Sequence, residues 1–221
     1  MNNYKIVEVK EDVVRRNDST ADKLRAKLKE KHIFFINLMA SPGSGKTTLL
    51  LNLLPLLKDK HRIAVMEADI DSDVDAATIS NKLNIPTLQI HTGGACHLTA
   101  QMVEDAIKDF DLSNIDLLIL ENIGNLVCPA EFDTGANMNL VLLSIPEGDD
   151  KPLKYPLMFE VANMVVATKL DTKEAFDFDI EKFHKNVKMR NPNATIFETS
   201  SIEKIGIDKV ANEIDKIISN Y

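Results

Sequence analysis

A glycine-rich segment that ends in lysine and threonine is the clearest chemical signal in the sequence. Residues 40–47 read Ala-Ser-Pro-Gly-Ser-Gly-Lys-Thr, which is the spacing of the phosphate loop G-x-x-x-x-G-K-[ST] with alanine in the first glycine place. Its glycines allow backbone N–H groups to surround phosphate oxygens, and a following helix adds its positive N-terminus. Lys46 would reach the β- and γ-phosphates and the Thr47 hydroxyl would ligate Mg²⁺. The nucleotide contacts expected from this loop are Gly43, Ser44, Gly45, Lys46, Thr47 and Thr48.

Three acidic residues follow apolar runs that we expect to be strands. Asp69 ends the run 63–68, Asp75 lies in the next loop, and Glu121 ends the run 117–120. In doubly wound folds, ligands gather at the carboxyl ends of strands. We expect Asp69, Asp75 and Glu121 to act with Lys46 in catalysis, and Asp69 and Glu121 to join Thr47 at Mg²⁺. The alternative is that these carboxylates are solvated strand ends.

Two further segments complete the expected nucleotide site. Gly124 could donate its N–H to a γ-phosphate, as switch loops do. Residues 168–171, Thr-Lys-Leu-Asp, resemble the guanine-reading N-K-x-D of GTPases, because a carboxylate at Asp171 can accept from guanine N1–H and its 2-amino group, a donor pair that adenine lacks. The Lys169 stem can lie across the base, and Ser200 and Ser201 fall where a second base loop is expected. GTP is therefore favoured over ATP. Threonine at 168 removes an amide that usually ties this loop to the phosphate loop, so we expect weaker affinity.

The two cysteines and one histidine form a second candidate site. Cys96 and His97 follow two glycines at the start of an expected helix over 98–110, and Cys128 precedes a proline in the loop after Glu121. These three donors suit Zn²⁺ or Ni²⁺. They leave a tetrahedral site open, to be filled by water or by a second subunit across a two-fold axis. The alternative is that each cysteine is a small core residue.

The elements that would position these residues alternate along the chain. Short, non-alternating apolar runs are typical of strands buried on both faces of a parallel sheet, and amphipathic segments such as 180–190 and 207–218 lie between them. This alternation predicts a doubly wound α/β domain with a mostly parallel sheet. We expect a P-loop domain over 32–221 and an N-terminal helical extension over 1–31, with Pro55 kinking or shortening its helix. The expected strands are 33–39, 63–68, 87–91, 117–120, 140–145, 164–167 and 196–199.

Composition narrows the class of protein. The chain has 221 residues, with 26 basic and 34 acidic side chains and a formal net charge of −8. The acidic balance argues against nucleic-acid binding, which needs clustered Lys and Arg. Two cysteines cannot form a disulfide framework, so a reducing compartment is expected. No apolar run long enough for a membrane span and no signal-peptide core is found. We therefore expect a cytoplasmic protein with no membrane or nucleic-acid partner.

Taken together, these motifs resemble one family. Residues 92–97 (Thr-Gly-Gly-Ala-Cys-His), the stretch 121–133 that begins Glu-Asn-Ile-Gly-Asn-Leu-Val-Cys-Pro, and residues 144–150 resemble the HypB hydrogenase nickel-incorporation GTPases over nearly the whole chain from about residue 10. The resemblance implies a SIMIBI-type G domain that dimerises, binds Ni²⁺ or Zn²⁺ between subunits and helps to deliver nickel to [NiFe]-hydrogenase. Its implied partners are other maturation proteins and the hydrogenase large subunit. It implies metal roles for Cys96, His97 and Cys128, and nucleotide or Mg²⁺ roles for Lys46, Thr47, Asp69, Asp75 and Glu121.

Several departures and alternatives stay open. The N-terminus lacks the cysteine cluster or histidine-rich stretch of many relatives, which argues against tight nickel storage. Ala40 and Thr168 leave room for a slow or weakly selective GTPase. A UreG-like GTPase is disfavoured because its C-P-H motif is replaced by Cys128-Pro-Ala. Outside this class stand a small-molecule kinase with Asp69 as base, and a partitioning-type ATPase or interaction module.

The arrangement also suggests a switch. Cys128 follows Glu121 by seven residues, so a shift of this segment on γ-phosphate binding would move a metal ligand. Nucleotide hydrolysis and metal binding would then be linked reciprocally.

Overall fold

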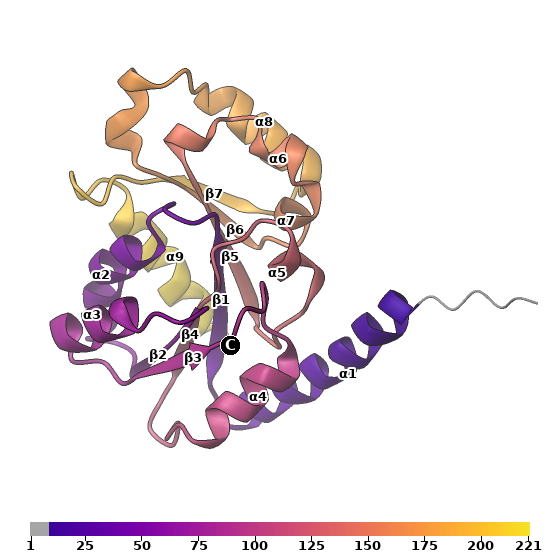
Figure 1. Ribbon diagram of the computed structural model, residues 1–221. Coiled ribbons are helices and arrows are strands. Elements are labelled where there is room, and N and C mark those ends of the chain that lie inside the picture. Colours follow the sequence, from indigo (N-terminus) through magenta and orange to yellow (C-terminus); the bar gives the residue numbers. More distant parts are fainter. Residues whose placement is uncertain (1–8) are drawn as a thin grey trace, which may run out of the picture.

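The computed structural model describes the backbone of residues 9–221 and side-chain surroundings from residue 12 onward. Its centre is a seven-stranded sheet in the order β3-β2-β4-β1-β5-β6-β7, with helices on both faces (Figure 1). Every strand pairing is parallel, which confirms the doubly wound α/β prediction. The strands are β1 (Phe34–Ala40), β2 (Ile63–Asp69), β3 (Thr87–His91), β4 (Leu117–Glu121), β5 (Met138–Ser144), β6 (Met164–Thr168) and β7 (Thr195–Glu198).

The central strand β1 shows why its sequence does not alternate. All seven of its residues are buried, because side chains that point to opposite faces both enter apolar cores. Phe34, Ile36 and Leu38 lie in the core cluster that includes α2 and α9. Phe35 and Met39 point to the other face, into two further clusters. The expected strands are all present, with ends shifted by one or two residues.

Helices cover the sheet in two layers. One face carries α2 (Lys46–Leu57), α3 (Val74–Leu83) and α9 (Ile207–Ser219). The opposite face carries α1 (Val9–Glu30), α4 (Ala100–Lys108), α7 (Pro156–Glu160) and α8 (Ile180–Arg190). The remaining short elements are α5 (Cys128–Glu131), η1 (Ile145–Glu147), α6 (Lys151–Lys154) and η2 (Leu170–Ala175).

Two helices differ from the sequence-based expectation. Helix α4 begins at Ala100, because Thr99 accepts a hydrogen bond from Met102 N (3.2 Å) and caps it, so Cys96 and His97 lie in the preceding loop and not on the helix. Helix α2 runs through Pro55 and ends two residues later. Pro55 therefore does not end the helix at its own position, because a proline so close to the C-terminus of the helix breaks few backbone hydrogen bonds.

The charged N-terminal segment forms one helix, α1, which lies beside α4 while its first turns reach past the body of the domain (Figure 1). Ala21, Leu24 and Leu28 are buried, and the two leucines share a core cluster with Phe35 of β1. From Ala21 onward, the predicted extension is thus packed on the domain. Among the described residues, no helix is both long and apolar enough to cross a membrane.

Candidate functional site

The phosphate loop connects β1 directly to α2. Gly43 and Gly45 have φ angles of 75° and 95°, in the left-handed region that favours glycine. Ala40 is the last residue of β1 and is fully buried. It lies in extended backbone, where a side chain is tolerated, so alanine in the first glycine place does not strain the loop. The loop and the first turn of α2 have the form that surrounds phosphate oxygens.

Three carboxylates converge at the carboxyl ends of β2 and β4. Oxygens of Glu67, Asp75 and Glu121 all lie within 4.8 Å of one another. Glu121 Oε1 accepts the Thr47 hydroxyl at 2.9 Å. Among the described residues, Oε2 of Glu67 and Oε2 of Glu121 are buried without a hydrogen-bond partner. Unpaired buried carboxylate oxygens are costly, and together with the Thr47 hydroxyl they form an oxygen donor set that fits Mg²⁺.

Burial changes the acidity of two of these groups. Desolvation raises the pKa of Glu121 to about 7, against the opposing effects of the Lys46 charge and the Thr47 hydrogen bond. Desolvation also raises the pKa of Glu67 to about 7, although a hydrogen bond from Gln89 acts in the other direction. The metal-free cluster therefore takes up protons near neutral pH, and a divalent cation would displace them.

Glu67, which the sequence analysis did not single out, lies in the carboxylate cluster, and Asp69 does not. Asp69 Oδ1 accepts the N–H groups of Ser72 (2.9 Å) and Asp71 (3.1 Å), which lower the pKa of Asp69. Asp69 thus stabilises the loop before α3 and is not one of the three clustered carboxylates; its expected role at Mg²⁺ stays a prediction. Glu67 was missed. Its signal is a charged residue inside an apolar strand that is buried on both faces.

The expected base loop is tied to the phosphate loop. Thr168 Oγ1 donates to Ser44 O at 2.6 Å, and Lys169 Nζ donates to Gly43 O at 2.7 Å. The structure therefore corrects the expectation that threonine at 168 loses this connection, because its hydroxyl makes one. Ser200 Oγ donates to Asp171 Oδ1 at 2.6 Å and so orients that carboxylate. A pocket of about 210 Å³ lies between the phosphate loop and the expected base loops. It is lined by Ser44, Gly45, Thr48, Thr168, Lys169, Asp171, Thr172, Ser201 and Ile202.

A further residue that sequence reasoning missed, Glu147 of η1, contacts the phosphate loop. Glu147 Oε2 accepts the hydroxyls of Ser44 (2.9 Å) and Ser144 (2.7 Å). Ser144 and Glu147 form a capping box at η1, a pattern visible in the sequence as serine followed three residues later by glutamate. The segment 144–150 thereby holds the buried Ser44 in place.

The segment after β4 lies directly against the phosphate loop. A Cβ placed on Gly124 would lie 2.9 Å from Cα and N of Pro42, so only glycine permits this approach. Asn125 N donates to Ala40 O at 2.9 Å. Gly124 therefore lies against the phosphate loop, and its expected contact with a γ-phosphate stays a prediction.

The sulfur and nitrogen donors also come together. Donor atoms of Cys96, His97 and Cys128 all lie within 4.8 Å of one another, and Cys96 Sγ lies 3.6 Å from His97 Nδ1. The His97 ring stacks on Phe132, with centroids 3.9 Å apart and an interplanar angle of 16°. Two sulfurs and an imidazole suit Ni²⁺ or Zn²⁺, and the group fits such an ion with a position left open.

The pKa values of Cys96 and His97 are shifted in opposite directions. A hydrogen bond with Cys128 is the largest cause that raises the pKa of Cys96. Burial lowers the pKa of His97, which favours the neutral ring that binds metals. Metal binding would therefore release protons chiefly from the thiols.

Helix α1 contacts both segments that carry the candidate metal ligands. The buried Asn17 accepts Ala100 N at 2.9 Å and donates to Asp133 O at 2.8 Å. Arg25 donates to Ala136 O at 3.0 Å and pairs with the Asp133 carboxylate. One helix thus contacts the chain just after His97 and just after Cys128.

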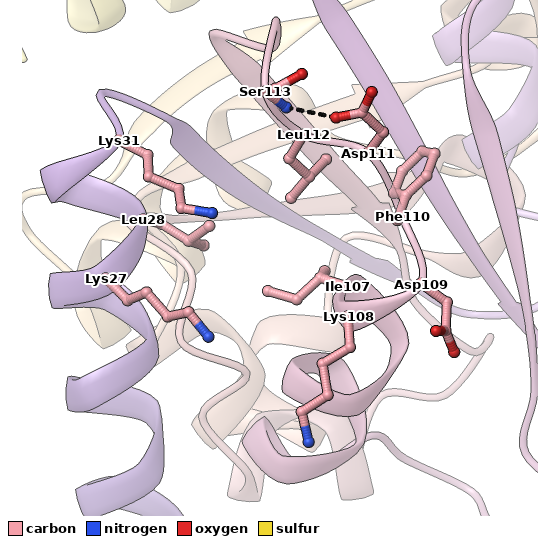
Figure 2. A pocket seen from close by; sticks show the side chains of 10 residues that line it. All are labelled: Lys27, Leu28, Lys31, Ile107, Lys108, Asp109, Phe110, Asp111, Leu112 and Ser113. Carbon is pink, nitrogen blue, oxygen red and sulfur yellow. Dashed lines mark hydrogen bonds between the residues drawn. The ribbon is translucent and has the colours of Figure 1, made fainter.

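Another pocket lies far from these groups, at the amino ends of β1 and β4. It has a volume of about 530 Å³ and lies between the last turns of α1 and α4 and the loop that follows α4 (Figure 2). Of its lysines, Lys27 pairs with Glu104 and Lys108 with Asp105. None of the predicted site residues lines it, so the candidate functional groups all lie at the other end of the sheet.

A strand, a phosphate loop and a helix, faced by carboxylates on neighbouring parallel strands, define a P-loop nucleotide-binding protein. The nucleotide-binding domain of CobW, HypB and UreG proteins matches residues 34–198. The chain belongs to this CobW/HypB/UreG family and, within it, to the HypB maturation factors.

Sequence relatives agree with this assignment. The hydrogenase/urease maturation factor HypB of Helicobacter hepaticus is 42% identical over 224 residues, covering 99% of this chain and 91% of that protein. The hydrogenase maturation factor HypB of Escherichia coli K12 is 40% identical, covering 97% of this chain and 74% of that protein.

Solved structures show the same relationship. HypB from Helicobacter pylori in complex with nickel is 40% identical with a TM-score of 0.87, covering 93% of this chain and 96% of that one. HypB from Archaeoglobus fulgidus is 35% identical with a TM-score of 0.85, covering 92% and 99%. A LAO/AO transport system kinase, at 16% identity and a TM-score of 0.53, shares the fold.

Proposed function

We propose that this chain is a GTP-hydrolysing metallochaperone that holds Ni²⁺ or Zn²⁺ and assists nickel insertion into [NiFe]-hydrogenase. The observation that carries the proposal is that one edge of the sheet holds both a phosphate loop with a tied base loop and a Cys-His-Cys donor set within 4.8 Å. The nickel complex of the Helicobacter pylori relative supports nickel as the cargo.

The nucleotide site supports hydrolysis of GTP. Lys46 would stabilise charge on the β- and γ-phosphates, and Gly124 would donate its N–H to the γ-phosphate. Thr47, Asp75, Glu121 and Glu67 would hold Mg²⁺ through their side-chain oxygens, and the ion would supply charge that neutralises the phosphates. Asp171, oriented by Ser200, would accept from guanine, and Ser201 would line the base pocket.

The cargo site supports a homodimer. Cys96, His97 and Cys128 provide three donors, and Cys96 is exposed, so a second copy related by a two-fold axis could complete the coordination. Val127, next to Cys128, exposes half of its surface, which is an apolar contact available to that copy. The expected partners in the cytoplasm are other hydrogenase maturation proteins and the hydrogenase large subunit.

The proposed switch joins the two sites. Gly124 lies against Pro42 of the phosphate loop, and the same segment continues to Cys128. A shift on γ-phosphate binding would therefore change the metal site, and metal binding would change nucleotide affinity by the same factor.

The alternatives are a UreG-like nickel GTPase and a small-molecule kinase with Asp69 as base. The first lacks the histidine of its C-P-H motif, since Ala130 stands there. The second needs Asp69 as a base, but hydrogen bonds from Ser72 N and Asp71 N lower the pKa of Asp69, which makes it a weaker base. The kinase also leaves the Cys-His-Cys cluster without a role.

The deciding experiment is a titration of Ni²⁺ into protein loaded with GDP or with a non-hydrolysable GTP analogue, with the oligomer size measured in each state. We expect the nickel affinity to differ between the two nucleotide states. We also expect the Cys96→Ala variant to lose nickel binding. Equal affinities would contradict the switch. Preference for ATP over GTP, or acceptor-dependent turnover, would favour the kinase.

A further inference from the structure

Asn125 contacts both the phosphate loop and the predicted metal cluster. Its backbone N–H donates to Ala40 O at 2.9 Å. Its side-chain Nδ2 donates to Cys96 O at 3.3 Å, and its Oδ1 accepts Val127 N at 2.9 Å. One residue thus binds the first residue of the phosphate loop, the carbonyl of one metal-ligand candidate and the residue before another.

The hydrogen bond from Asn125 to Cys96 O joins the loop that carries Cys96 to the segment after β4. The Cys96 loop comprises residues 92–99, and the segment after β4 comprises residues 122–128. Apart from the thiol contact between Cys96 and Cys128, the Asn125–Cys96 hydrogen bond is the one that joins these two regions within residues 9–221. The Asn125 amide is therefore the side chain outside the candidate ligands that connects the Cys96 loop to the segment after β4.

The backbone next to Asn125 is packed and hydrogen-bonded against the phosphate loop. Gly124 touches Pro42 so closely that no Cβ fits between them, and Asn125 N holds Ala40 O. A displacement of this backbone therefore carries the Asn125 amide with it, and that amide holds the Cys96 carbonyl.

We propose that Asn125 is the positioning residue that transmits the nucleotide state to the metal cluster through its Nδ2–Cys96 O hydrogen bond. The amide sets the distance between the Cys96 loop and the segment that carries Cys128, so the two thiolates reach a common ion in one arrangement of the phosphate loop and separate in the other. This inference rests on the proposed function and adds the atom that carries the linkage.

The test uses two variants of the full chain that lose the same donor. Asn125→Asp keeps the shape and the acceptor for Val127 N but loses Nδ2, and Asn125→Ala loses the whole amide. Ni²⁺ affinity is measured by chelator competition with GDP and with a non-hydrolysable GTP analogue. For the unaltered chain we expect the two affinities to differ by about 5- to 150-fold, the usual range of coupling between sites.

In both variants we expect the ratio of the two nickel affinities to fall to about one. Nickel should still bind, as measured by the thiolate-to-nickel absorption band. The affinity for the GTP analogue in the absence of nickel should be unchanged. By reciprocity, nickel should also stop changing GTP-analogue affinity. If Asn125 had a merely structural role, its loss would change the nickel affinity by the same factor with GDP and with the GTP analogue. The ratio of the two affinities would then stay the same.

Asn191→Asp is a matched control. Asn191 Nδ2 donates to Ala162 O at 2.8 Å and Oδ1 accepts Asn193 N at 3.0 Å, which repeats the hydrogen-bond pattern of Asn125 at the end of α8, away from both sites. We expect this variant to keep the ratio of the unaltered chain.

The outcomes separate the inference from the proposed function. If the unaltered chain shows the ratio and both Asn125 variants keep it, the inference is overturned and the proposed function stands. If both variants lose nickel in both nucleotide states, Asn125 only maintains the cluster and the inference is overturned. If the unaltered chain has equal affinities, the proposed switch and this inference fail together.

Discussion

The phosphate-loop edge and the Cys-His-Cys cluster lie on the same side of the sheet but are built differently. At the phosphate-loop edge, buried groups such as Ser44, Thr168 and Glu121 are 4% exposed or less, and each is hydrogen-bonded to another segment. In the cluster, Cys96 is exposed and Cys128 half-buried, and the donors chiefly contact one another. The nucleotide site is therefore prearranged within one chain, whereas the metal site is left open.

This difference has a physical reason. Phosphate and Mg²⁺ need several oriented dipoles that cost little to reorganise, which favours a rigid, buried arrangement. A cargo ion must enter and leave, which favours exposed ligands with few supporting contacts. The following predictions test that contrast, from the largest expected effect to the smallest.

Lys46→Ala should separate the two regions most clearly. Removal of the charge that we expect to contact the β- and γ-phosphates should lower single-turnover GTP hydrolysis on the order of 10²- to 10³-fold. Nickel affinity of the nucleotide-free protein should not change. Lys58→Ala, at the other end of the same helix, is the control and should hydrolyse GTP normally. A matching loss of nickel binding in Lys46→Ala would show that the regions are not built independently.

The buried carboxylates should make metal-free stability depend on pH. The pKa values of Glu67 and Glu121 are raised to about 7, above their value in the unfolded chain. The folded state thus holds more protons between pH about 4.5 and 7, and the free energy of unfolding should fall as pH rises through that window, by about 1.4 kcal/mol per pH unit for each group at most.

Urea denaturation at pH 5 and pH 8 measures this dependence. Glu67→Gln should flatten it, and Mg²⁺ should restore stability at pH 8 more than at pH 5. A stability of the metal-free protein that rises with pH over this range would contradict the assignment of these two groups.

Gly124→Ala should damage the contact between the segment after β4 and the phosphate loop. The added Cβ meets the Pro42 backbone at 2.9 Å, and such overpacking costs about 1–3 kcal/mol. We expect a lower urea midpoint and weaker binding of the GTP analogue, measured by denaturation and calorimetry. Ala95→Gly, in the exposed Cys96 loop, tests whether that region is as sensitive. Equal losses in both variants would remove the contrast between a rigid and an open region.

Phe132→Leu should have the smallest effect, because it removes only the ring stacked on His97. Loss of such stacking costs about 0.5–1.5 kcal/mol, so nickel affinity should fall by about 2- to 10-fold in chelator competition, with GTP hydrolysis unchanged. Phe176→Leu, an exposed phenylalanine after η2, should leave nickel affinity unchanged. A Phe132 effect on hydrolysis as large as its effect on nickel would contradict the separation of the two regions.

The sequence predicts those parts of the molecule that depend on local pattern. The strands, the phosphate loop and the placement of Glu121 follow from apolar runs and spacing, and the structure brings Cys96, His97 and Cys128 together as expected. The Thr168–Ser44 and Glu147–Ser44 contacts could not be predicted, because each joins segments more than 100 residues apart in the chain. Glu67 was missed because its strand was interpreted as uniformly apolar, and Asp69 was favoured because strand ends are where ligands gather.

The position of Asn17 bears on how this protein can be dissected. Its amide binds both the start of α4 and the chain after Cys128, so α1 connects the two segments that carry the candidate metal ligands. A fragment that starts at residue 32 would keep the phosphate loop and lose this connection. A minimal protein for nickel studies should therefore retain α1, even though every predicted nucleotide contact lies beyond it.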